Sequence, residues 1–142
     1  MIASLLALLA AASIANAEEL GSSPLVEEGH THRWVEFARD QEGAGWLDEA
    51  WRSQVEVDGR RFVLVLIRSD IAPPNAMIAD FVLAVDCERR MTGMKQVWLF
   101  KSDYGDGVGR EVPVELSPVG SPPDKEDQQI LAYACKAGSG RR

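Results

Sequence analysis

The sequence predicts an α+β domain: an antiparallel β-sheet of about six strands, with a C-terminal helix packed on one face and one disulfide. Short runs of alternating apolar and polar residues recur between turn-forming residues, a pattern typical of antiparallel strands. Residues 124–136 instead carry apolar side chains at helical spacing. The chain has two cysteines, Cys87 in a predicted strand and Cys135 in the predicted helix. Strands followed by one terminal helix indicate an α+β architecture.

The predicted strands follow one another with short turns between them. Asp58-Gly59 is a strong signal for a two-residue hairpin. Residues 62–67 are apolar at every position, which favours a central strand buried on both faces. Pro113 suits an edge strand, because proline cannot donate a hydrogen bond to a neighbour. In chain order, strands are expected at residues 34–38, 45–48, 54–57, 62–67, 77–87, 95–101 and 112–116.

The predicted helix has clear boundaries. Ser121 can act as the N-cap, and Pro122 fits the first helical position. Asp124 lies in the first turn, where the helix dipole favours an acidic side chain. Lys136 lies in the last turn, and Gly138 can end the helix. We therefore expect one helix to close the domain.

The two cysteines allow one intramolecular pairing, Cys87 with Cys135. Cys87 shares a strand face with Phe81, Leu83 and Val85, while Cys135 lies on the apolar stripe of the helix. A disulfide between them would stabilise the fold by about 4 kcal/mol on the chain-entropy model. A reactive or metal-binding pair is the alternative, but no C-x-x-C spacing or adjacent histidine favours it.

The N-terminus resembles an export signal. Residues 2–15 are apolar or small and uncharged, and Ala15-Asn16-Ala17 is an A-x-A cleavage motif before Glu18. We expect a signal peptide over 1–17, a flexible arm over 18–31, the domain over 32–137 and a disordered tail over 138–142. The alternatives are a retained anchor or a wrongly assigned start codon. No cysteine directly follows the apolar run, so we expect a periplasmic or extracellular protein without a lipid anchor.

The charge balance limits the classes of partner. The formal net charge is −7, which disfavours nucleic acid and electrostatic docking to anionic lipid. The leader is too short to span a bilayer, and no other segment is as long and apolar as a transmembrane helix requires.

Several short motifs follow one another across residues 34–136: Trp34-Val35-Glu36-Phe37, Trp46-Leu47-Asp48, Asp86-Cys87, Ser117-Pro118-Val119-Gly120-Ser121-Pro122 and Tyr133-Ala134-Cys135. Their order resembles that of the surface-adhesin protein E family of exported bacterial proteins.

This resemblance implies an antiparallel sheet with a C-terminal helix, a Cys87–Cys135 disulfide and a homodimer. It also implies a non-catalytic binding role toward an envelope or host-matrix protein, without a cofactor. The sequence departs from the family's lipid-anchored namesake in lacking the anchoring cysteine, and no ligand-binding residues can be carried over.

Two segments suggest metal binding. His30 and His32, with Glu27 and Glu28, could bind a divalent transition metal, although a solvated polar arm is the favoured interpretation. The acidic side chains of the glycine-rich loop raise a calcium hypothesis. Their spacing misses the EF-hand pattern, so an ordinary hairpin loop is favoured. The acidic residues of that loop are Asp103, Asp106 and Glu111.

Few groups suit catalysis. His30 and His32 are the two imidazoles of the chain, and no G-x-S-x-G motif is present. The acidic pairs Asp48-Glu49 and Asp86 with Glu88 are expected at strand ends in solvent, although Asp86 could instead accept hydrogen bonds from a turn. The sequence therefore predicts a protein that is not an enzyme, and the alternative is a small metal-binding or hydrolytic periplasmic protein. For the four tryptophans, core packing is favoured over an exposed protein-contact patch: Trp34, Trp46, Trp51 and Trp98.

Overall fold

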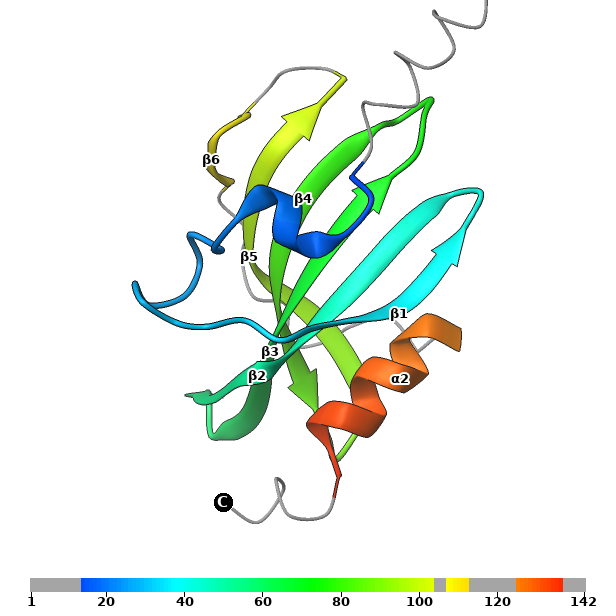
Figure 1. The fold of residues 1–142 in the computed structure, drawn as a ribbon. Coiled ribbons are helices and arrows are strands. Elements are labelled where there is room, and N and C mark those ends of the chain that lie inside the picture. Colours follow the sequence, from blue (N-terminus) through cyan, green and yellow to red (C-terminus); the bar gives the residue numbers. More distant parts are fainter. Residues whose placement is uncertain (1–13, 104–106, 113–124, 137–142) are drawn as a thin grey trace, which may run out of the picture.

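A computed structural model describes residues 14–103, 107–112 and 125–136. Within these residues, six antiparallel strands form one sheet in which each strand pairs with the next along the chain, and one α-helix follows (Figure 1). The elements are the 3₁₀-helix η1 (Ala17–Leu20), β1 (Trp34–Asp40), β2 (Gly43–Val57), β3 (Arg60–Ile71), β4 (Met77–Asp86), β5 (Met91–Ser102), β6 (Arg110–Val112) and α2 (Lys125–Ala134).

The predicted α+β class is wrong, because the structure is predominantly β. Strands account for 56% of the structure and helices for 10%. Four strands, β1, β2, β3 and β5, are longer than their sequence patterns indicated. Two predicted strands, at 45–48 and 54–57, are parts of β2, which has 15 residues and stays paired with β3 across an irregularity. The C-terminal helix is present, but with ten residues it covers only part of one face of the sheet.

The hairpin between β2 and β3 confirms the prediction from Asp58-Gly59. Val57 pairs with Arg60, and the two residues between them have φ angles of 52° and 79°. Glycine adopts a positive φ without strain and aspartate tolerates it better than most residues, so this dipeptide sets the register of β2 and β3.

The core lies on both faces of the sheet, because β3 is apolar at successive positions. Val63, Val65 and Ile67 face α2 and pack with Ile130 and Leu131. The alternate side chains of β3, which are Phe62, Leu64 and Leu66, pack on the other face with Val82, Ala84 and residues of the N-terminal segment. The prediction of a central strand buried on both faces is confirmed.

The predicted disulfide is present. Cys87 follows β4 and Cys135 follows α2, and their Cα atoms are 5.5 Å apart. Both cysteines pack against the core between α2 and the sheet. The bond therefore ties the helix to the sheet.

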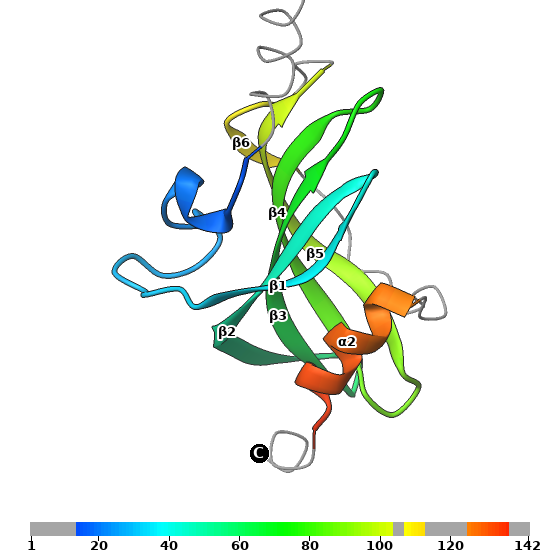
Figure 2. The same cartoon turned by 45° about the vertical axis from the view of Figure 1, so that its right-hand side comes forward.

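The segment before β1 packs across the face of the sheet opposite α2 (Figure 2). Ser23 is buried, and Leu25 and Val26 contact the core of that face. This packing contrasts with the flexible arm expected over 18–31.

Some sequence-based expectations lie outside the described residues. They concern leader residues 1–13, the tail at 138–142, and Asp106, Pro113, Val114, Leu116, Ser121, Pro122, Asp124 and Gly138. In the part of the chain that is described, no helix combines the length and apolar character needed to cross a membrane.

Candidate functional site

An irregularity in β2 buries a carboxylate at the edge of the core. Leu47 pairs with Ile67 and Arg52 pairs with Val65, so residues 48–51 lie opposite a single residue of β3. Such a bulge redirects side chains out of the regular alternation. Asp48, at its start, is fully buried. Its Oδ1 accepts the backbone N–H groups of Arg33 at 2.9 Å and Ala50 at 2.8 Å.

Two imidazoles from the segment before β1 meet the other oxygen of this carboxylate. The Oδ2 of Asp48 lies 2.9 Å from Nε2 of His30 and 2.6 Å from Nδ1 of His32. The side chains of His30 and His32 are only 11% and 8% exposed. The His32 ring also stacks on Trp34, with ring centroids 4.8 Å apart. His30, His32 and Asp48 are called the His–His–Asp cluster below.

The hydrogen bonds of His32 define its tautomer. The backbone N–H of Ser23 donates to Nε2 of His32 at 3.0 Å, so that nitrogen carries a lone pair. The ring proton is therefore on Nδ1, which donates to Asp48. Both nitrogens of His32 are engaged within the protein.

The charge state of Asp48 follows from its surroundings. Burial by itself raises the pKa of this carboxyl, but hydrogen bonds from the Arg33 N–H, His32, the Ala50 N–H and His30 together lower the pKa below its usual value. Asp48 is therefore an anion held by four donors, which accounts for a charged group in a buried position.

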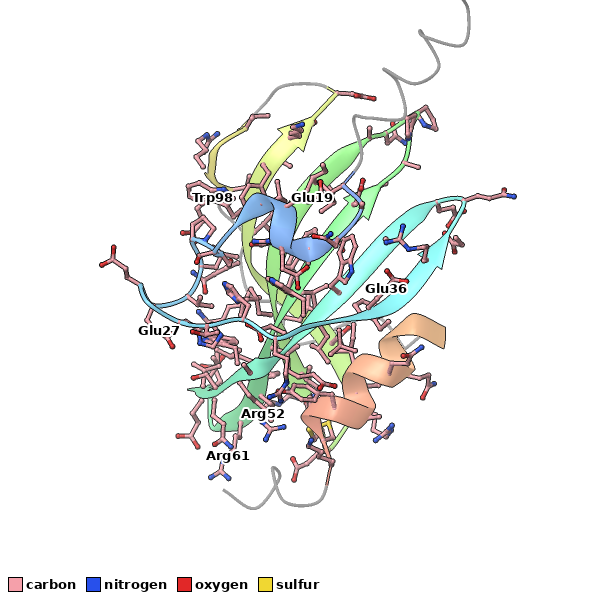
Figure 3. The ribbon with its side chains drawn as sticks, viewed as in Figure 1. Glu19, Glu27, Glu36, Arg52, Arg61 and Trp98 are labelled. Carbon is pink, nitrogen blue, oxygen red and sulfur yellow. A yellow bond between two sulfur atoms is a disulfide. The ribbon has the colours of Figure 1, made fainter. Side chains whose placement is uncertain are left out.

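The same three side chains have the composition of a transition-metal site. Their ligand atoms lie within 4.8 Å of one another, and among the described residues this is the one such group of His, Cys, Asp or Glu. Two imidazoles and a carboxylate suit zinc. Nδ1 of His30 faces Oε2 of Glu27 at 3.6 Å, an arrangement that could orient the ring for a metal. Glu27 is labelled in Figure 3, on the N-terminal segment.

One contact opposes metal binding. A metal on Nδ1 of His32 would place the ring proton on Nε2, where it would face the N–H of Ser23. Ser23 or the ring would have to move before an ion could enter. The hydrogen-bonded cluster is complete without such a change.

The structure places the other predicted site residues apart from this cluster. Oδ1 of Asp86 accepts the backbone N–H groups of Glu88 and Arg89, which confirms a structural role in the turn after β4. Asp103 and Glu111 of the proposed calcium loop are exposed, and Asp106 lies outside the described residues.

The tryptophans fit the core-packing prediction to different degrees. Trp46 is only 4% exposed. Trp34, Trp51 and Trp98 are half-buried, and Trp51 donates its indole N–H to Glu27 at 3.2 Å. None of the four is therefore an exposed contact residue.

Sequence reasoning missed Asp48 as the partner of the histidines, because it was expected in solvent. Asp48 ends Trp46-Leu47-Asp48 and directly follows two buried residues, and this position could have indicated that its carboxylate is buried. The contact of the Asp48 carboxylate with His30 and His32 requires the bulge in β2, which no local sequence pattern predicts.

Comparison with known proteins adds no family. No family model, curated protein or solved structure matches the chain. The fold and the site define the class by themselves: a predominantly β domain, closed by a disulfide, with a buried His–His–Asp cluster.

Proposed function

We propose that this protein is an exported, non-catalytic binding domain of the surface-adhesin protein E type, acting on a protein partner in the bacterial envelope or beyond it. The observation that carries the proposal is the Cys87–Cys135 disulfide. Disulfides form and persist in oxidising compartments, and this one follows an A-x-A motif that ends an apolar leader.

The state of the imidazoles supports binding rather than catalysis. A general base needs a lone pair directed toward a substrate. Nε2 of His32 already accepts the Ser23 N–H, and Nδ1 of His32 donates to Asp48. His30 donates to the same carboxylate. The cluster thus has the features of a structural network that anchors the N-terminal segment to β2.

The intact mass of the protein from a fractionated native host tests this proposal. We expect a periplasmic or secreted species that begins at Glu18, lies two mass units below the dithiol and takes two alkyl groups only after reduction. A cytoplasmic species that begins at Met1 with free thiols would overturn both the export and the family-based function. Pull-down from envelope extracts or host matrix then tests the binding role, and the absence of a saturable partner would count against it.

The His–His–Asp cluster supports a second candidate function, the binding of a divalent metal. In this function, zinc titrated into the protein in a calorimeter gives saturable heat with one ion per chain. His30→Gln abolishes the heat, because it removes one of the three metal-binding side chains of the cluster. Asp58→Asn, at the exposed hairpin tip, serves as the matched control and keeps it. A titration of the unmodified protein without heat eliminates this candidate.

A further inference from the structure

Residues 14–17 are held along the sheet by side chains that bind their backbone. The N–H of Ile14 donates to Oδ2 of Asp70 at 2.8 Å, in a buried position. Nη2 of Arg39 donates to the Ala15 carbonyl at 3.1 Å, and Nη1 of Arg68 donates to the Ala17 carbonyl at 2.5 Å. These three residues bind main-chain groups, which any peptide has, on a segment that bends at Ala15 and Asn16 and enters η1 at Ala17.

The side chains of the same segment fill an apolar floor. Ile14 is 7% exposed and Ala17 is fully buried. They pack with Trp46 of β2 and Ile78 of β4, and the neighbouring Ala44 and Phe100 are partly buried. The floor and the polar groups come from adjacent positions of paired strands, since Ala44 pairs with Asp70 and Trp46 pairs with Arg68. We call this region the leader slot; it consists of Arg39, Ala44, Trp46, Arg68, Asp70, Ile78 and Phe100.

The leader slot matters because cleavage between Ala17 and Glu18 would remove its occupant. Asp70 would lose the N–H of Ile14, although it is a buried carboxylate at 5% exposure. Arg68 would keep Asp80 and the Gly21 carbonyl but lose the Ala17 carbonyl. Buried polar groups are costly without hydrogen-bond partners. The empty slot therefore favours another peptide that offers the same main-chain groups and covers the same apolar floor.

We propose that cleavage of the leader opens this slot as a peptide-binding site. Its ligand is a short segment of a partner protein that has small apolar side chains and follows the course of residues 14–17. A backbone N–H of the ligand donates to Asp70, and its carbonyls accept from Arg39 and Arg68, in the chain direction of residues 14–17. This inference rests on the proposed export and cleavage, and it gives the binding domain a ligand class.

The uncleaved chain is self-occupied. Glu19, labelled on η1 in Figure 3, accepts the backbone N–H groups of Ala15 and Asn16 with the same oxygen, at 2.7 and 3.1 Å. This cap holds the segment in register with the slot. The precursor therefore binds the ligand more weakly than the processed protein does, because its own segment competes for the slot.

A fluorescent peptide tests the proposal by anisotropy. The probe is Ala-Ala-Ala-Ser-Ile-Ala-Asn-Ala, the sequence of residues 10–17, labelled at its N-terminus. We expect saturable binding to the processed protein from the native host, and at least about tenfold weaker binding to the full-length chain, because its own segment competes. A second probe with proline in place of isoleucine lacks the N–H that Asp70 accepts, so it should not bind.

Variants of the processed protein provide the site control. Asp70→Asn replaces a charge-assisted hydrogen bond with a neutral one and should weaken binding about tenfold. Asp58→Asn, far along the β2–β3 hairpin, should leave it unchanged. Equal binding of the proline probe overturns the proposal. Absence of probe binding to a protein whose chain begins at Glu18 also overturns it, because the slot has then closed over itself. If intact mass finds only chains that begin at Met1, the failure lies in the proposed export, and the slot is permanent packing.

Discussion

Arg68→Met is expected to lower the free energy of unfolding by about 3–5 kcal/mol, because it leaves a buried carboxylate without its counter-charge. The side chains of Arg68 and Asp80 are both fully buried, on neighbouring strands β3 and β4. Two parallel hydrogen bonds of 2.6 and 2.9 Å join them. The guanidinium also lies 4.6 Å from the ring centroid of Trp34 and 5.1 Å from that of Phe100. Urea denaturation followed by circular dichroism measures the loss.

Two controls separate the lost charge from the lost side chain. Arg33→Met removes an exposed arginine whose Nε lies 3.8 Å from Glu49, and we expect a change below about 1 kcal/mol. The double variant Arg68→Met with Asp80→Leu removes both charges at similar volume and should recover most of the stability. If the double variant were as unstable as Arg68→Met alone, the unpaired charge would not be the cause.

Loss of the disulfide is expected to cost about 4 kcal/mol and to lower the melting temperature by roughly 10–20 °C. The crosslink spans 48 residues, so its removal frees a long loop in the unfolded chain. It also frees α2, whose Ile130 and Leu131 cover one face of β3. Differential scanning calorimetry of the variant with both Cys87→Ala and Cys135→Ala measures the effect.

The unmodified protein with and without reductant provides the matched comparison. Reduction breaks the same bond without changing the sequence, so the melting temperature should fall by a similar amount. If the variant melted at the same temperature as the unmodified oxidised protein, the crosslink would not contribute to stability. A fall in the variant without a fall on reduction would assign the effect to packing of the two sulfur atoms.

Much of the sheet could be predicted because its signals are local. The hairpin at Asp58-Gly59 depends on the positive φ angles of two adjacent residues. The central position of β3 depends on an uninterrupted apolar run. The pairing of Cys87 with Cys135 followed from the presence of two cysteines, and the apolar faces that carry them agreed with it.

Other features depend on contacts between distant segments. The α+β class was wrong because local patterns underestimate strand length. Once β2 pairs with β3, exposed polar residues such as Arg52 and Ser53 join the ladder at no cost in burial. The segment at 18–31 looked like a flexible arm because its composition is polar. In the structure, His30 and His32 satisfy Asp48 and so tie the segment to the sheet.

By itself, the sequence determined the antiparallel hairpins, the buried central strand, the terminal helix and the disulfide, because each depends on backbone preference or on the apolar face of one element. Only the tertiary structure decided the burial of Asp48 beside two histidines, of Arg68 beside Asp80, and of Ile14 and Ala17 in the leader slot. A buried polar group is stable only with partners, and these partners come from segments 12 to 56 residues away in the chain.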